Sequence, residues 1–239
     1  MQREYGPSEY LSMPLVFGVD VARFGGDKSV VFPRRGLVAQ APIILSGQDN
    51  VEAADRIVSL YHEYMPHSIF VDAGQGQGVI DILKRNLRCV YEIPFGGQAL
   101  DPAKFINRRS EMWFLMREWI RSGGKIPDTP ELVSELSAPV YSFNATGKIQ
   151  LEKKESIKER IGRSPDLADA LALTFAVPVM PDVGDRQEYA ITQRYALGAR
   201  SLFGNHNDYN NDDNDDDYGS PSRQKYADGV DRSLFSLWE

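Results

Sequence analysis

Short apolar runs alternate with polar, glycine-rich segments along the first part of the chain. Three β-strands are predicted at residues 15–20 (LVFGVD), 28–32 (KSVVF) and 37–45 (LVAQAPIIL), with the third interrupted at Pro42. Apolar residues that recur every three or four positions then predict a helix over residues 51–65. The short connections between the three strands allow them to pair as hairpins.

The following part of the chain alternates strands with helices. Because a strand–helix–strand crossover joins parallel strands, the strands at 15–20 and 68–73 should run in the same direction. This order predicts an α/β fold with a mixed central sheet flanked by helices. The further elements that the pattern predicts are strands at 68–73 and 89–95, helices at 79–87 and 107–123, a hairpin with its turn at 144–147, and a helix over 164–176 with Ser164 as its N-cap and Pro165 at its first position.

The two ends of the chain differ from this region. Residues 1–14 are polar, and Pro7 and Pro14 argue against regular structure there. Residues 15–182 should form one folded domain, and residues 183–239 an extension that is largely a flexible, disordered acidic tail rich in Asn and Asp. The final apolar stretch, DRSLFSLWE, either docks on a partner or packs back on its own domain.

Charge and composition narrow the class of protein. The net charge is −7, but nine acidic and only three basic residues lie after position 200, so the folded part is nearly neutral. The folded part therefore lacks the strongly basic net charge of a free-standing nucleic-acid binder. A nearly neutral net charge is still compatible with a local basic groove. No membrane span or signal peptide is predicted, and the single Cys89 excludes an internal disulfide and fits a reducing cytosol.

Acidic residues stand where predicted strands end. Asp20 closes the first strand and Asp72 closes the strand at 68–73, so both carboxylates should emerge at one edge of the sheet. Asp166 and Asp169 are three positions apart at the start of the last helix and therefore share a face. Each acid alone is readily explained as a turn or helix cap.

Together the carboxylates predict a metal site. Three converging carboxylates repel one another, and we expect them to raise one another's pKa when no cation is bound. Hard divalent ions such as Mg²⁺ or Mn²⁺ would relieve the repulsion, and two such ions can clamp a phosphodiester. Such a site needs no histidine.

Three motifs, in order and spacing, resemble the nuclease domain of the large terminase subunit of tailed bacteriophages. They are GVDVARFGGDKS, VDAGQGQG and SPDLADALALTF, and the resemblance runs from about Leu15 to Val177. The resemblance implies an RNase H-like fold and an endonuclease that uses two Mg²⁺ or Mn²⁺ ions to cut concatemeric viral DNA during genome packaging. The chain has no G-x-x-x-x-G-K-[ST] motif of an ATPase motor, so residues 1–14 would be the remnant of an interdomain linker.

The resemblance also assigns roles to the acids. It implies that Asp20 bridges both ions, that Asp72 is the second catalytic ligand and that the third is Asp169, with Asp166 in reserve. Asp27, in the GGDKS loop, is a candidate for an additional or supporting ligand. The GQGQG segment after Asp72 lacks the last glycine of a dinucleotide-binding loop and is better explained as a tight loop that lets the DNA backbone approach.

Basic residues near the last helix are candidates for phosphate contacts, the alternative being a solvated helix with internal ion pairs. The candidates are Lys148, Lys153, Lys154, Lys158, Arg160 and Arg163, with a second strip at Lys104, Arg108 and Arg109.

The resulting hypothesis is a two-metal DNA endonuclease of viral genome packaging, acting in the host cytoplasm on double-stranded DNA. The resemblance implies the terminase ATPase domain, the small terminase subunit and the portal protein as partners. Two alternatives remain at this point: a junction resolvase or repair nuclease of the same fold, and a non-catalytic module that docks on a portal or motor.

Overall fold

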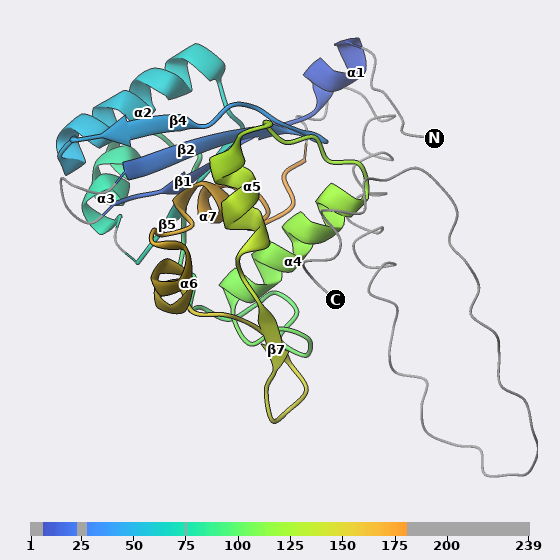
Figure 1. Ribbon diagram of the computed structural model, residues 1–239. Coiled ribbons are helices and arrows are strands. Elements are labelled where there is room, and N and C mark those ends of the chain that lie inside the picture. The colour runs from blue at the N-terminus through green and yellow to red at the C-terminus, as the bar shows by residue number, and fades with distance from the viewer. Residues whose placement is uncertain (1–6, 23–27, 75, 181–239) are drawn as a thin grey trace, which may run out of the picture.

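A mixed β-sheet forms the centre of the protein, with helices on both of its faces (Figure 1). The computed structural model describes residues 7–22, 28–74 and 76–180. Within them the elements are α1 (Pro7–Ser12), β1 (Leu15–Asp20), β2 (Lys28–Arg35), β3 (Val38–Ala39), β4 (Ile43–Ser46), α2 (Asn50–Tyr64), β5 (Ser68–Asp72), α3 (Gln77–Asn86), β6 (Val90–Ile93), α4 (Arg108–Arg121), α5 (Pro130–Ser137), β7 (Tyr141–Phe143), β8 (Ile149–Leu151), α6 (Lys154–Ile161) and α7 (Asp166–Leu173).

The central sheet has the strand order β3-β2-β1-β5-β6, with β4 also paired to β2. The pairs β1–β2, β2–β3 and β2–β4 are antiparallel, whereas β1–β5 and β5–β6 are parallel. The parallel pairs follow from the crossovers through α2 and α3, as predicted. The fold class expected from the sequence, a mixed sheet flanked by helices, is therefore confirmed.

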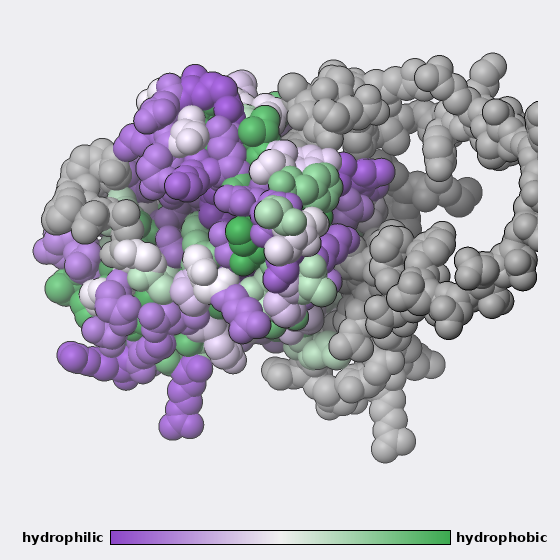
Figure 2. Space-filling view, turned by 90° about the horizontal axis from the view of Figure 1, so that it is seen from below, coloured by the Kyte–Doolittle hydropathy of each residue, from purple (hydrophilic) through white to green (hydrophobic). Residues whose placement is uncertain are grey.

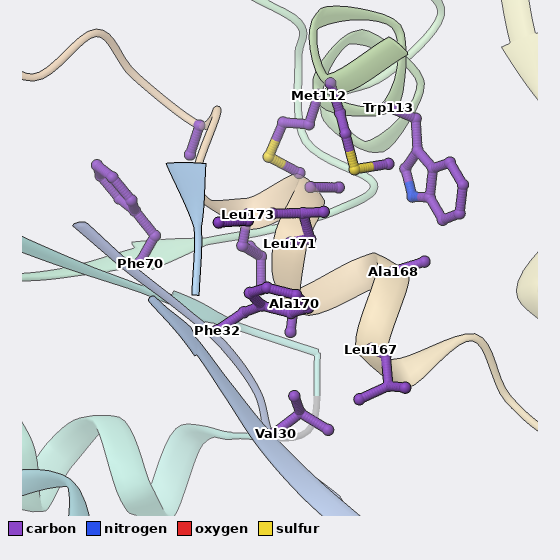
Figure 3. Close-up of a cluster of buried hydrophobic side chains, with 14 of the residues drawn as sticks. Val30, Phe32, Phe70, Met112, Trp113, Leu167, Ala168, Ala170, Leu171 and Leu173 are labelled. Carbon is purple, nitrogen blue, oxygen red and sulfur yellow. The ribbon is translucent and has the colours of Figure 1, made fainter. Parts of the chain in front are cut away.

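Successive side chains of the buried strands point to opposite faces of the sheet, and this divides the core into two layers. One set of strand residues, including Leu15, Phe17 and Val19, packs against α2 and α3. The other set, including Phe32 and Phe70, packs against α7 and α4. Figure 3 shows this second layer, in which α7 lies between the strands and the side chains Met112 and Trp113 of α4.

Helix α7 lies unusually close to the sheet. All of its residues from Leu167 to Leu173 are buried. A Cβ atom added at Gly18 of β1 would overlap the carbonyl oxygen of Ala170 and lie 3.0 Å from Cβ of Leu173. The absence of a side chain at Gly18 is therefore what allows the helix backbone to lie directly on β1.

Three local features differ from the sequence predictions. Residues Pro7–Ser12 form a short helix, which is possible because proline is accommodated at the first position of a helix. Helix α5 was not among the predicted elements, although the proline at its first position is a helix-start signal. The cap position of α7 is occupied by Pro165 rather than Ser164, and no side chain from the preceding segment caps the helix.

None of the helices within the described ranges is long and apolar enough to cross a membrane.

Candidate active site

Two carboxylates lie side by side at one edge of the sheet. Strands β1 and β5 are parallel neighbours, and Val19 is in register with Val71, so the residues that follow, Asp20 and Asp72, end the two strands at the same level. Both acids are buried, with exposures of 4% and 7%. The predicted placement of these two acids at the carboxyl ends of parallel strands is the one observed.

Helix α7 brings two further carboxylates to Asp20, and a lysine lies between them. The Nζ atom of Lys154 is 2.8 Å from Oδ2 of Asp20, 3.0 Å from Oδ1 of Asp166 and 3.4 Å from Oδ2 of Asp169. Lys154 is the first residue of α6, which runs directly into the segment before α7. One ammonium group thus connects β1 with both acids of α7.

Asp169 is anchored from its other side by helix α4. Its Oδ1 atom accepts hydrogen bonds from Nε of Arg109 at 3.0 Å and from Nε1 of Trp113 at 2.8 Å. Arg109 also donates to the carbonyl oxygen of Glu152 at 2.8 Å, which ties α4 to the segment between β8 and α6. Asp169 is fully buried and directs only Oδ2 toward Lys154. Asp166 keeps 27% of its side chain exposed.

The pKa values of the acids differ according to their surroundings. Burial raises the pKa of Asp20 to about 8, helped by the charges of Asp169 and Asp166 and opposed by Lys154. Burial also raises the pKa of Asp72, although the Gly74 amide opposes it. Burial acts in the same direction on Asp169, but Arg109, Lys154 and the Trp113 hydrogen bond outweigh it and lower its pKa. The expectation that all three acids would have raised pKa values is therefore wrong for Asp169.

The glycine-rich loop after β5 fixes the Asp72 carboxylate. The backbone N–H of Gly74 donates to Oδ1 of Asp72 at 3.1 Å, the pattern of an Asx turn. A Cβ atom at Gly76 would come within 2.8 Å of the Asp72 carbonyl oxygen. The glycines thus allow the chain to turn tightly beside this acid.

Negative charge exceeds positive charge at the site. The carboxylates of Asp20, Asp72, Asp166 and Asp169 face the cations of Lys154 and Arg109. Within residues 7–22, 28–74 and 76–180, no three acidic, histidine or cysteine side chains are grouped to hold a metal ion as they stand. In the described structure, three of the carboxylates are instead held together by their contacts with the ammonium of Lys154. Asp27 lies outside the described residues.

Several basic residues predicted to contact DNA have internal partners. Arg108 is buried and pairs with Glu111 at 2.7 Å, Arg160 pairs with Glu152 at 2.6 Å, and Arg163 lies 3.5 Å from Glu135. Lys153 and Lys158 of the α6 region are exposed, and Lys148 and Lys104 are partly exposed. Figure 2 views the molecule from below, the side on which α6 and the β7–β8 hairpin lie in Figure 1, and shows extensive hydrophilic surface with smaller apolar areas.

Sequence reasoning missed two features of the site. Lys154 was predicted to contact DNA, and Trp113 was given no role at the site, whereas both side chains bond to the site carboxylates. A buried tryptophan N–H needs a partner, so the apolar face of α4 carried a weak signal for Trp113. No local pattern distinguishes Lys154 from its neighbours Lys153 and Lys158.

Comparison with protein-family models finds no match, and comparison with curated protein sequences finds none either.

Solved structures, in contrast, include clear likenesses. The nuclease domain of the large terminase subunit gp2 of bacterial virus Sf6 matches with a TM-score of 0.58 and 21% identity, over 70% of this chain and 89% of that domain. The large terminase nuclease of thermophilic phage G20c with bound magnesium matches with a TM-score of 0.53 and 16% identity, over 72% and 83%. A mutant Sf6 gp2 nuclease domain with manganese gives a TM-score of 0.57 at 19% identity, over 69% and 89%. The chain therefore has the RNase H-like fold of phage large terminase nuclease domains.

Proposed function

We propose that this protein is a metal-dependent endonuclease that cuts double-stranded viral DNA during genome packaging. The observation that carries the proposal is the convergence of Asp20 and Asp72, at the ends of two parallel strands, with Asp166 and Asp169 of α7. The fold adds support, because it is the fold of terminase nuclease domains. In open α/β sheets, ligands bind at such carboxyl ends.

The chemistry of the site fits a divalent cation. Its donors are carboxylate oxygens, which suit Mg²⁺ and Mn²⁺, and its negative charge is only partly balanced by Lys154 and Arg109. Solved terminase nucleases include forms with magnesium and with manganese. Two bound ions would activate water and stabilise the leaving oxygen of a phosphodiester.

We assign the cation-binding roles to the four acids as follows. Asp20 and Asp72 would contribute carboxylates from the strand ends. We propose Asp20 as the ligand that two ions would share, as the resemblance to terminase nucleases implies. Asp169 would offer Oδ2 to a cation, because Oδ1 accepts the two shorter hydrogen bonds from Arg109 and Trp113, whereas the bond from Arg109 to Oδ2 is 3.5 Å long. Asp166 is the more accessible acid of α7. We therefore propose Asp169 as a rigid ligand and Asp166 as a second ligand from the same helix.

Lys154 holds the metal-free cluster together. Its ammonium is within 3.4 Å of three carboxylates and balances part of their charge. A divalent cation among these carboxylates would compete with that ammonium. Arg109 serves a different purpose, because it fixes the orientation of Asp169 from the buried side.

DNA contacts are proposed for the basic residues that project from the surface near α6. Lys153 and Lys158 are exposed beside the segment that leads to Asp166, and Lys148 and Lys104 flank them on the hairpin and the neighbouring loop. These contacts would be to phosphates and therefore independent of sequence. Arg108, Arg109 and Lys154 are directed inward and are proposed to position the site instead.

The biological setting is proposed from the fold likeness. A terminase nuclease of this kind would act in an infected host cell together with an ATPase motor, a small terminase subunit and a portal protein.

Cleavage of supercoiled plasmid tests the proposed activity. Wild type, Asp72→Asn and the control Asp55→Asn, on the exposed side of α2, are incubated with Mn²⁺, Mg²⁺ or EDTA. We expect nicked and linear products only with metal, and only in wild type and the control. Metal-dependent cleavage that survives Asp72→Asn would contradict the assigned site. In a parallel comparison, cleavage of four-way junctions in preference to linear duplexes would favour a resolvase.

A further inference from the structure

The N-terminus of helix α7 has no capping side chain of its own. The first N–H groups of a helix have no partner within the helix and normally receive one from a Ser, Thr, Asp or Asn at the cap position. In α7 that position is Pro165, whose side chain cannot accept a hydrogen bond. The helix that carries Asp166 and Asp169 therefore depends on another element for its cap.

Glu135 of helix α5 supplies that cap from elsewhere in the chain. Its Oε2 atom accepts a hydrogen bond from the backbone N–H of Ala168 at 3.0 Å, across 33 positions of sequence. Ala168 is the third residue of α7, which is a position that a local cap residue would serve. The Glu135 side chain is buried, with only 1% of the residue exposed.

The contacts of Glu135 separate it from the cation-binding acids. Its Oε1 atom lies 3.5 Å from Nε of Arg163, and its Oε2 atom is bonded to Ala168. Both oxygens are thus engaged on the α5 side of the helix, whereas Asp166 and Asp169 turn toward Lys154. Glu135 is therefore not a further ligand of the site.

A second charged side chain, which is partly buried, holds the opposite end of α7. Arg34 of β2 donates from Nε to Oγ1 of Thr174 at 2.8 Å and from its terminal nitrogen to the Thr174 carbonyl at 2.7 Å. A carboxylate at the N-terminus and a guanidinium at the C-terminus both complement the helix dipole. Of Glu135 and Arg34, only Glu135 lies beside the site, because it bonds to Ala168, which is next to Asp169 in the helix.

We propose that Glu135 is a positioning residue, which caps α7 from helix α5 and so fixes Asp166 and Asp169 in the orientation that binds divalent cations. This inference rests on the proposed metal-dependent function. It assigns a role at the site to a residue of α5 that acts through the backbone of α7 and not through a site carboxylate.

The test compares variants of two glutamates on the same helix. Glu135→Ala removes the cap, Glu135→Gln retains an oxygen that can accept from Ala168, and Glu131→Ala removes an exposed glutamate 3.9 Å from Arg163. Mn²⁺ affinity of the full chain is measured by calorimetry. Amide hydrogen exchange of the peptide containing Ala168 is measured in EDTA.

For Glu135→Ala we expect a Mn²⁺ affinity weaker by about tenfold, together with faster exchange at the start of α7. Glu135→Gln should restore most of the affinity, and Glu131→Ala should resemble wild type. A folded Glu135→Ala protein with wild-type Mn²⁺ affinity would overturn the proposal, even if its melting temperature fell. Unchanged exchange at Ala168 would overturn it independently of any metal.

Glu135→Ala can be replaced by a more conservative variant, and hydrogen exchange gives a readout that does not need metal. If Glu135→Ala does not fold, Glu135→Asp takes its place, because its carboxylate is drawn back by one methylene and should weaken Mn²⁺ binding. Wild-type affinity in that variant would also overturn the positioning role. If wild type itself shows no Mn²⁺ binding, the proposed function fails, and with it the metal-orienting part of this inference, while the exchange data still decide whether Glu135 caps α7.

Discussion

The ammonium nitrogen of Lys154 lies 2.8 Å from Oδ2 of Asp20, although the two residues are 134 positions apart in the chain. The same nitrogen is within 3.4 Å of Asp166 and Asp169. The pairing joins the end of β1 to α6 and α7 and brings a positive charge among carboxylates that would otherwise repel one another. The charge on Lys154 is therefore a determinant of how the site responds to cations and to pH.

Removing this ammonium should favour metal binding. In Lys154→Ala the carboxylates lose their internal cation, so Mn²⁺ no longer competes with it, and calorimetry should show tighter binding than in wild type. In EDTA the variant should be less stable, because Asp166 and Asp169 lose their partly buried cationic partner. The loss should stay below the cost of breaking a fully buried ion pair, about 3–5 kcal/mol, because 29% of the Lys154 side chain is exposed. Lys153→Ala, which changes an exposed neighbour, is the control. Weaker Mn²⁺ binding by Lys154→Ala would show that the lysine supports the ion instead of competing with it.

Stability without metal should fall as the pH rises. The pKa of Asp20 is raised to about 8 in the folded protein from 3.8, mainly by burial, so the folded state holds a proton that the unfolded state has lost. The resulting stabilisation is complete below the unfolded pKa and is lost as the pH approaches about 8. Glu135, whose pKa burial raises to about 7, contributes with the same sign.

Urea unfolding in EDTA across this pH interval measures the effect. Asp20→Asn should reduce the slope of the unfolding free energy against pH. The slope that remains would be the contribution of Glu135. Mn²⁺ affinity should show the opposite trend and rise with pH, because the cation requires deprotonated carboxylates. A stability that increases with pH across the interval would be inconsistent with a protonated Asp20 in the folded protein.

Gly18 should be intolerant of even a methyl group. The Cβ of Gly18→Ala would overlap the carbonyl oxygen of Ala170, so α7 would have to move away from β1. Overpacking of this kind costs about 1–3 kcal/mol, and the backbone overlap places this case at the upper end. Because Asp169 moves with α7, Mn²⁺ affinity should fall as well. Gly96→Ala, at a position with no atom within 4 Å of the added Cβ, should be close to wild type in both urea unfolding and calorimetry.

Lys153 and Lys158 should contribute to DNA affinity without sequence preference. Removing one lysine–phosphate interaction should reduce the slope of log affinity against log salt by about 0.9. The double variant Lys153→Ala/Lys158→Ala is compared with Arg56→Ala on α2, which packs on the opposite face of the sheet. Anisotropy of a labelled duplex in EDTA separates binding from cleavage. An unchanged salt slope in the double variant would place the DNA elsewhere on the surface.

The cap of α7 illustrates how far local sequence rules reach. The sequence SPDLADAL correctly predicts a helix, because a proline near the start and a run of helix-forming residues are strong local signals. It also predicts Ser164 as the cap, and that is wrong, because the structure uses Glu135. A buried carboxylate 33 positions away satisfies the same amide, and no local rule can anticipate that partner.

The sequence by itself determined the elements of the sheet and the acids at their ends. Short, continuous apolar runs between polar segments are sufficient to locate β1 and β5. The crossover rule makes the two strands parallel, so Asp20 and Asp72 meet at one edge of the sheet. These inferences need only periodicity and chain connectivity, which are properties of short segments.

Only the tertiary structure decided how the remaining charges are paired. Arg109 and Lys154 are basic residues like their neighbours in sequence, yet one anchors Asp169 and the other lies among three carboxylates. Which cation is drawn inward depends on how closely α7 lies on Gly18 and on where α4 and α6 begin beside it. The physical reason is that burial makes an unpaired charge costly, so the packing of distant elements selects each partner.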